Sequence, residues 1–178
     1  AALFSAAIIL SGANSDATEN AVVFQTCIEK AEKISETIWP LDKRETALGK
    51  IALAYARFES FEQIERIAND IHDPQRKANA ILETISYSKL RLQNPEATAR
   101  LLPIAKDSAL ALSQTPVRDN FLWRIAYDQA LIRRVEDALQ TSQLVTTPIL
   151  QEQALYQISS AQSQNDDIEG AIATAELM

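Results

Sequence analysis

Apolar residues recur along this chain at the spacing of α-helices, and one short pattern of them is repeated. Leu-x-x-Ile followed by Ala or Ser occurs four times, beginning at Leu48, Leu82, Leu122 and Leu155. The isoleucines of successive copies are 34, 40 and 33 residues apart. The Leu, the Ile, the small residue and the position three beyond it fall on one stripe of a helix, because a helix has about 3.6 residues per turn. Each copy therefore predicts a helix with the same buried face, whose small residue lets a neighbouring helix approach closely.

A second series of positions keeps the same register. Ten residues beyond each Ile of the pattern stands a residue followed by glutamate, in the pairs Phe61-Glu62, Pro95-Glu96, Val135-Glu136 and Ile168-Glu169. Ile28-Glu29 is a fifth pair, 33 residues before the first. Glutamate favours the positive end of the helix dipole, and we expect Ser60, Asn94 and Asp167 to cap the helices that begin here. Each unit thus predicts a second helix after a short turn.

Proline marks the breaks between units, at Pro40, Pro74, Pro116 and Pro148. The unit that begins at Leu82 carries about six extra residues and has Pro103 inside its second helix, so we expect that helix to be longer and kinked. The helices that we expect span residues 2–11, 17–38, 43–57, 61–72, 75–91, 95–113, 117–132, 135–145, 149–163 and 167–178.

A single helical hairpin cannot cover its own apolar stripe, so hairpins of this kind stack on one another. The sequence therefore predicts an all-α fold, a right-handed α-solenoid of about four to five helix–turn–helix repeats of 33–34 residues. We expect one domain over residues 1–178, with divergent N-terminal helices in 1–27 and the repeats in 28–178. We also expect the chain to be part of a longer protein.

The unit that begins at Leu48 resembles the tetratricopeptide repeat family. The residues that carry the resemblance are Leu48, Ile51, Ala52, Tyr55, Phe61, Ala68 and Asp73-Pro74. The resemblance extends over about residues 28–178, but Lys89, Gln129 and Gln162 replace the tyrosine in later units. Related families of helical hairpins therefore remain an alternative.

The resemblance implies that the first helix of each unit lines a concave groove. The groove positions are then the first, fifth and eighth residues after each Leu of the pattern, and three of the four tyrosines and one of the two tryptophans fall on them. Tyr and Trp are frequent anchors of protein interfaces. The candidate partner-binding residues are Leu53, Arg57, Tyr87, Leu90, Arg91, Trp123, Tyr127 and Tyr156. The alternative is that these rings only pack between units.

Two arginines lie at the edge of these groove positions. At that place, Arg57 and Arg91 could bind acidic groups of a ligand. Some tetratricopeptide modules grip chaperone C-termini with a carboxylate clamp of Lys, Asn and Arg. The equivalent positions here hold Gly, Glu, Trp, Tyr, Leu and Ser, so we do not expect that activity.

Charge argues against nucleic acid as the partner. The net charge is −7 and the pI is near 4.8, whereas binding to phosphates needs a basic surface. All 17 bases lie in residues 30–134 with 14 acids, and residues 135–178 hold seven acids and no base. The middle of the chain is therefore weakly basic and its C-terminal quarter acidic. Binding of single-stranded RNA would regain support only from a basic inner face.

The sequence offers little for catalysis. His72 precedes Asp73-Pro74 at an expected helix end, where we expect it to be solvated or capping, and Cys27 falls in an apolar stretch that we expect to be core. No glycine-rich phosphate loop and no metal-ligand spacing is present, so we expect no enzyme, no metal and no cofactor. Nothing reaches the roughly 18 apolar residues of a membrane span.

These observations favour a non-catalytic scaffold or adaptor that binds a protein or peptide in the groove. The alternative is a structural spacer or self-association domain of a larger protein. Ala1–Leu10 and Ile168–Met178 are apolar ends without polar caps, which would favour self-association.

Overall fold

The computed structural model describes residues 17–89 and 94–178, and helices are its regular structure throughout that part of the chain. The expected helix 2–11 and the candidates Leu90 and Arg91 lie outside the described residues. The described helices are α2 (Ala17–Ser35), α3 (Leu41–Ala56), α4 (Phe61–Asp70), α5 (Pro74–Tyr87), α6 (Pro95–Leu110), α7 (Thr115–Leu131), α8 (Val135–Gln143), α9 (Pro148–Gln164) and α10 (Ile168–Ala175). The all-α prediction is confirmed, with each of these helices within a few residues of its expected bounds.

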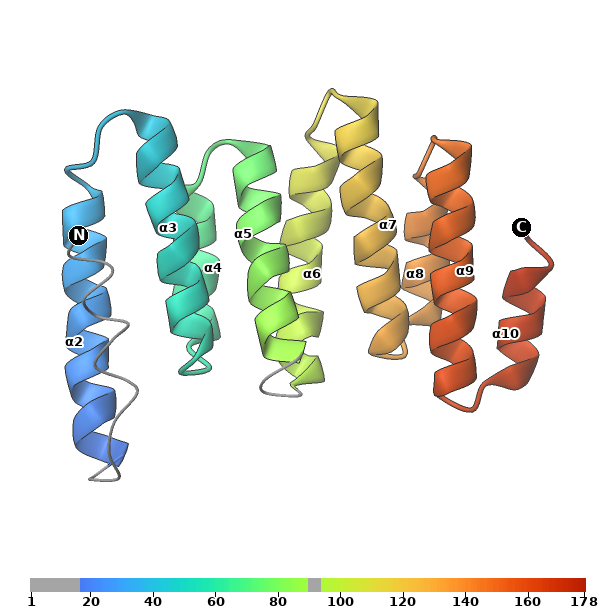
Figure 1. The fold of residues 1–178 in the computed structure, drawn as a ribbon, viewed down its shortest axis with the longest axis horizontal. Helices are drawn as coiled ribbons and strands as arrows, with labels where there is room; N and C mark the ends of the chain where they lie inside the picture. The colour runs from blue at the N-terminus through green and yellow to red at the C-terminus, as the bar shows by residue number, and fades with distance from the viewer. Residues whose placement is uncertain (1–16, 90–93) are drawn as a thin grey trace.

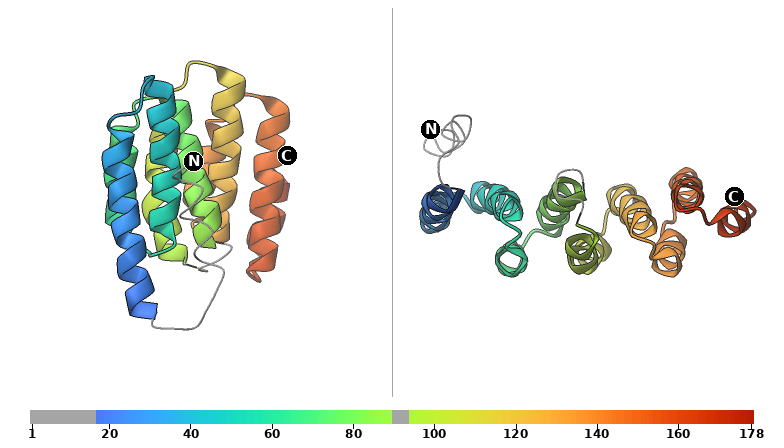
Figure 2. Two further views of the ribbon diagram at one scale, coloured as in Figure 1. Left: turned by 60° about the vertical axis from the view of Figure 1, so that its left-hand side comes forward. Right: turned by 90° about the horizontal axis from the view of Figure 1, so that it is seen from below.

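The helices stand side by side in chain order along the long axis of the molecule (Figure 1). Seen from below, α3, α5, α7 and α9 form one layer, and α4, α6 and α8 lie on one side of it (Figure 2). Within the first layer α3 packs on α5 and α7 packs on α9, whereas α5 and α7 are joined mainly through α6, which packs on both. Helix α4 packs mainly on α3, and α8 packs on α7 and α9. The structure therefore consists of two layers, and the helices of one layer run antiparallel to those of the other (Figure 1).

The repeated Leu and Ile positions form the centre of this packing. Leu48, Leu82, Leu122 and Leu155 are all buried, and so are the isoleucines three residues after each of them. One apolar cluster extends from α2 to α7, and a smaller one lies among α7, α8 and α9. Trp123 of α7 packs against both clusters. The Leu and Ile of the expected stripe are thus buried in all four units, whereas Ser86, Lys89 and Ser159 of the same stripe are only half-buried.

The turns within the units that begin at Leu48, Leu122 and Leu155 share one backbone conformation. Glu59, Arg133 and Asp166 each stand eleven residues after the Leu of their unit, and each has a positive φ, of 54°, 64° and 63°. In each turn the next backbone N–H donates to a carbonyl five residues earlier, as Arg134 does to Gln129 at 2.9 Å. The repeat in the sequence is thus matched by a repeat in the backbone.

The expected helix caps are confirmed at two of three places. Asn94 and Asp167 accept from the backbone N–H three residues on, at 3.0 Å in each case. The expected cap at Ser60 is wrong, because its hydroxyl donates to the carbonyl of Phe58, although weakly at 3.4 Å. Pro103 lies inside α6, which has 16 residues against 10 in α4 and 9 in α8, so the expected longer helix is confirmed.

Helix α2 joins the array through a polar contact and a narrow apolar stripe. The buried hydroxyl of Tyr55 in α3 donates to Glu32 of α2 at 3.2 Å. Burial, and after it the charge of Glu32, raises the pKa of Tyr55 to about 12. Cys27 is exposed, so its expected place in the core is wrong: the stripe that faces α3 runs through Phe24 and Ile28, and Cys27 lies beside it.

The structure also bears on the expectations for His72 and for membrane-spanning helices. The side chain of His72 is exposed at the turn between α4 and α5, as expected for a solvated residue at a helix end. No helix in residues 17–89 or 94–178 combines the length and the hydropathy that a membrane span needs.

Candidate interaction surface

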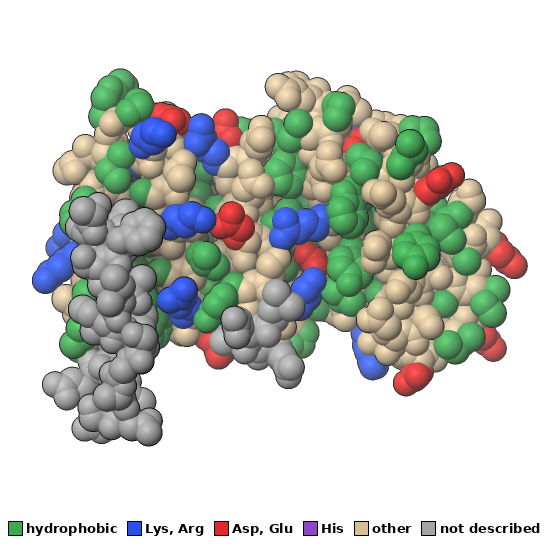
Figure 3. All heavy atoms as spheres, in the orientation of Figure 1, with side chains coloured by type: hydrophobic (Ala, Val, Ile, Leu, Met, Phe, Trp, Pro, Cys, Tyr) green, Lys and Arg blue, Asp and Glu red, His purple; other side chains and the backbone are tan. Residues whose placement is uncertain are grey.

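The described candidate residues lie on α3, α5, α7 and α9, or directly after α3 in the case of Arg57, on the side of these helices that faces away from α4, α6 and α8. We call this surface the first-helix face. Figure 3 looks directly onto it, since in the same orientation α4, α6 and α8 lie behind the first layer (Figure 1). The face is built by the residues of each helix that adjoin its buried Leu and Ile stripe.

The four candidate aromatic residues differ in exposure. Tyr156 of α9 is 61% exposed, whereas Tyr87, Trp123 and Tyr127 are half-buried. Tyr87 and Trp123 pack against the larger apolar cluster. Trp123 thus contributes to packing between units and still presents part of its ring on the face. Of these four, Tyr156 contributes least to the packing of the core.

The remaining candidates lie near the other end of the face. Leu53 of α3 is half-buried and Arg57 is exposed. The guanidinium of Arg57 lies over the ring of Tyr87, 5.8 Å from its centroid, so the two candidates contact each other. Such a contact holds a long side chain against the surface while its charge stays accessible.

Two expected groove positions are wrong. Ala56 and Ala130, each eight residues after the Leu of its unit, are fully buried. The eighth position lies closer on the helix to the buried stripe than the fifth does, and the neighbouring helix covers it. Gly49 is also close to a neighbour, because a Cβ there would lie 3.2 Å from the Cβ of Ala80 in α5. The absence of a side chain at Gly49 permits the close approach of α3 and α5.

Three cationic residues on this face were missed by the sequence reasoning. Lys50 of α3 pairs with Glu83 of α5 at 3.1 Å. Lys89 pairs with the buried Asp128 at 2.7 Å, and its ammonium lies over the ring of Tyr127, 5.1 Å from the centroid. The separation of Lys50 and Glu83 by 33 residues, about one repeat, is the sequence signal that would have placed them side by side.

The third cation, Arg124 of α7, is fixed without a carboxylate. It donates to the carbonyl of Leu82 at 3.2 Å and to the hydroxyl of Ser86 at 2.7 Å, both in α5. Its side chain therefore crosses the space between α5 and α7 along the face.

The first-helix face has two chemically different halves. Over α3, α5 and the near side of α7 its charged side chains include the cations Lys50, Arg57, Lys89 and Arg124, two of which pair with a carboxylate. Over α7 and α9 the side chains beyond these are mainly aromatic or uncharged polar, with Glu152 as an exposed acid near the start of α9; they include Trp123, Tyr127, Gln153, Tyr156 and Ser160. Figure 3 shows blue and red side chains over α3 and α5, and mainly green and tan ones over the middle of α9.

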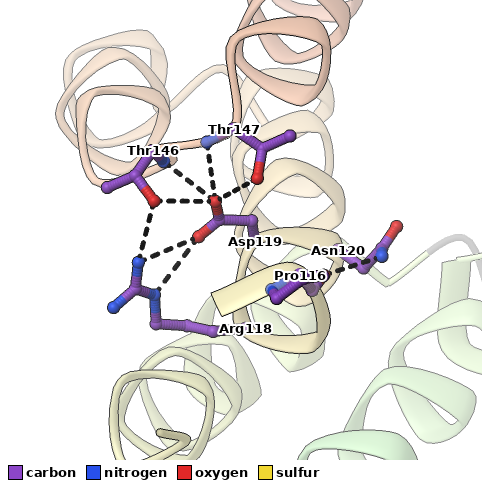
Figure 4. Close-up of polar contacts among 6 residues, drawn as sticks. All are labelled: Pro116, Arg118, Asp119, Asn120, Thr146 and Thr147. Atoms are coloured by element: carbon purple, nitrogen blue, oxygen red, sulfur yellow. Dashed lines mark hydrogen bonds and ion pairs between the residues drawn. The ribbon is translucent and has the colours of Figure 1, made fainter. Parts of the chain in front are cut away.

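A buried carboxylate forms the most complete polar cluster of the described chain (Figure 4). One oxygen of Asp119 in α7 accepts from the backbone N–H of Thr146 at 3.0 Å and of Thr147 at 2.8 Å, and from both their hydroxyls. Its other oxygen accepts from the guanidinium of Arg118 at 3.2 Å. Burial by itself raises the pKa of Asp119, but the hydrogen bonds of Thr147, Thr146 and Arg118 outweigh it, so the pKa is lowered.

Glu45 of α3 binds the backbone of a turn in the same way, two units earlier in the chain. It accepts from the backbone N–H of His72 at 2.8 Å and of Asp73 at 3.2 Å, and lies 3.6 Å from the guanidinium of Arg76. In both cases the donors lie 27 and 28 residues after the carboxylate. Because their oxygens accept from the backbone N–H groups of a turn, these two acids hold that turn against the first helix of the unit.

In the part of the chain that the structure describes, no three His, Cys, Asp or Glu side chains come together where they could hold a metal ion. Comparison of the chain with models of known protein families, with curated proteins and with solved structures found no match.

Proposed function

We propose that the chain is a non-catalytic interaction module, a right-handed solenoid of tetratricopeptide-like helical hairpins whose first-helix face binds a peptide or helix of a partner protein. The repeated register supports the solenoid: equivalent Leu residues are buried, and equivalent turns share a positive φ. Such an array presents one continuous surface of first helices to a partner.

The single observation that carries the binding proposal is the aromatic half of the face. Tyr127 and Tyr156 stand on successive first helices with Trp123 beside them, and Tyr156 is 61% exposed without being needed for the core. Partly exposed Tyr and Trp on a rigid helical layer give apolar contact area at a low cost in side-chain entropy. This residue set suits a role as scaffold or adaptor.

Selection from a random peptide-display library on the wild-type chain tests the proposal. The affinity of an enriched peptide is measured by fluorescence anisotropy for the wild type and for Tyr156→Ala, and we expect a loss of about ten-fold. Leu110→Ala is the matched control, because Leu110 is 45% exposed but lies on α6 in the other layer. Circular dichroism verifies that both variants remain folded.

Two results would contradict the proposal. One is a library that yields no peptide above background on the folded wild type. The other is a peptide whose affinity falls equally for Tyr156→Ala and for Leu110→Ala.

Self-association is the second candidate, and a separate surface favours it. Helix α10 and the residues after it expose Ile168, Ile172, Leu177 and Met178 at one end of the array. An exposed apolar set of this kind often marks an interface. Light scattering across a range of protein concentrations measures the mass, and a constant monomer mass would contradict self-association.

A further inference from the structure

The two halves of the first-helix face define the chemistry of a ligand more narrowly than the proposed function does, and this inference rests on that function. The cationic half is spread over α3, α5 and α7. Of the cations Lys50, Arg57, Lys89 and Arg124, two pair with a carboxylate, Lys50 with Glu83 and Lys89 with Asp128, in a protein whose net charge is −7. A local positive field on an acidic protein attracts an anionic group to one place.

Two of the four cations are available to a ligand. Among the described residues, neither Arg57 nor Arg124 takes part in an ion pair with a carboxylate. Arg57 rests on the ring of Tyr87, and Arg124 is held by the carbonyl of Leu82 and the hydroxyl of Ser86. Both side chains are therefore positioned in advance, which reduces the entropy lost when a carboxylate binds.

The other half offers no cation to a ligand. On α9 the residues of the face are Gln153, Tyr156, Gln157, Ser160 and Gln164, and the exposed Glu152 lies one turn before Tyr156. The exposed ring of Tyr156 and the partly exposed rings of Trp123 and Tyr127 give this half an apolar character. An acidic group placed here would lose water and find no cation to pair with.

We propose that the ligand of the first-helix face is a peptide of two blocks, with acidic residues over α3, α5 and the near side of α7 and apolar residues over α7 and α9. Charge complementarity with Arg57 and Arg124 selects the acidic block. The rings of Trp123, Tyr127 and Tyr156 select the apolar block. A single-stranded nucleic acid matches this face less well than such a peptide does, because binding along a phosphate backbone needs many free cations and the aromatic half of the face supplies none.

Synthetic peptides test this proposal directly by fluorescence anisotropy. One carries a block of Asp and Glu beside a block of Leu and Phe, and the second has Asn and Gln in place of the acids. We expect the acidic peptide to bind about ten-fold more tightly than its neutral analogue, and the difference to shrink at high salt. We also expect Arg57→Gln to lower the affinity for the acidic peptide by about five-fold and to leave the affinity for the neutral peptide unchanged.

Arg100→Gln is the matched control, since Arg100 is exposed on α6 in the other layer and has the same charge. Equal affinities for the two peptides, or equal effects of Arg57→Gln and Arg100→Gln, would overturn the two-block ligand. If, in that case, Tyr156→Ala still lowered the affinity for both peptides, the first-helix face would remain a peptide-binding surface without a preference for an acidic block. If Tyr156→Ala changed the affinity for neither peptide, the proposed function would fail as well. Tighter binding of a single-stranded oligouridylate than of the acidic peptide would also overturn the inference.

Discussion

The turns that join one unit to the next are held in two different ways. The turns between α4 and α5 and between α8 and α9 are each bound by a buried carboxylate from the first helix of their unit, Glu45 and Asp119. The turn between α6 and α7 has no such contact, because the equivalent residue, Asn79, is exposed on α5. The residue three before the repeated Leu is thus a buried acid in the units that begin at Leu48 and Leu122, and an exposed asparagine in the unit that begins at Leu82.

The length of the second helix explains the difference. A carboxylate three residues before the repeated Leu reaches a turn that lies 27 and 28 residues later. In the unit that begins at Leu82, these positions are Lys106 and Asp107, which lie within α6. The extra residues in that unit move the turn out of reach, so a buried acid at residue 79 would have no donors. The contact therefore depends on the repeat length as much as on the acid.

The largest expected effect comes from removing the carboxylate at the more completely bonded turn. Asp119→Asn removes the charge and replaces one acceptor oxygen by an NH2 donor, so either the donors of Thr146 and Thr147 or the guanidinium of Arg118 loses its acceptor. We expect it to lower the free energy of unfolding by about 3 kcal/mol. Asn79→Asp, the same exchange in reverse at the unbonded unit, is expected to change stability by less than about 0.5 kcal/mol. Urea denaturation followed by circular dichroism measures both, and equal effects would remove the distinction between the two kinds of turn.

A smaller effect is expected from pH. The pKa of Asp119 in the folded chain lies below the ordinary value of 3.8, so the unfolded chain takes up this proton at the higher pH. The stabilisation is therefore fully present above pH 3.8 and is lost as the pH falls through the folded pKa. We expect the stability gap between wild type and Asp119→Asn to narrow in that acid range. A gap that stays constant between neutral and strongly acidic pH would show that the charge of Asp119 contributes nothing.

The smallest effect concerns the three described turns within units, which are alike where the turns between units differ. Arg133 holds a φ of 64°, a conformation that costs an L-residue with a side chain more than it costs glycine. We expect Arg133→Gly to raise the free energy of unfolding by about 0.5 kcal/mol, because the relief of this strain exceeds the entropy that glycine adds to the unfolded chain. Arg134→Gly is the control at the next residue, whose φ is −90°, and should destabilise. Destabilisation by both would contradict this reading of the turn.

The sequence was sufficient for the helices and for the core. Periodicity placed every described helix, since repeated Leu and Ile residues leave one way to bury a continuous stripe. It failed for Cys27, where a run of apolar residues is wider than the face that α3 covers. It also failed for Ala56 and Ala130, which the neighbouring helices enclose.

The polar contacts were beyond reach for a different reason. In the sequence, Glu45 and Asp119 look like ordinary acids near the starts of helices until the position of the next turn is known. The cations of the face depend in the same way on which helices are neighbours, as the contact of Arg124 with Leu82 and Ser86 shows. A register of 27–28 residues from an acid to a Pro-marked turn is the signal that a later search of such sequences could use.

The central claim is that the first-helix face, and not the other layer, binds a peptide. Titration of the isotope-labelled chain with a library-selected peptide, followed by amide chemical shifts in NMR spectra, tests it most directly. We predict that the shifts which change most will belong to α5, α7 and α9, with Tyr127 and Tyr156 among them, and that α4 and α8 will change little. Changes concentrated on α4, α6 and α8, or confined to the ends of the array at α2 and α10, would contradict the account.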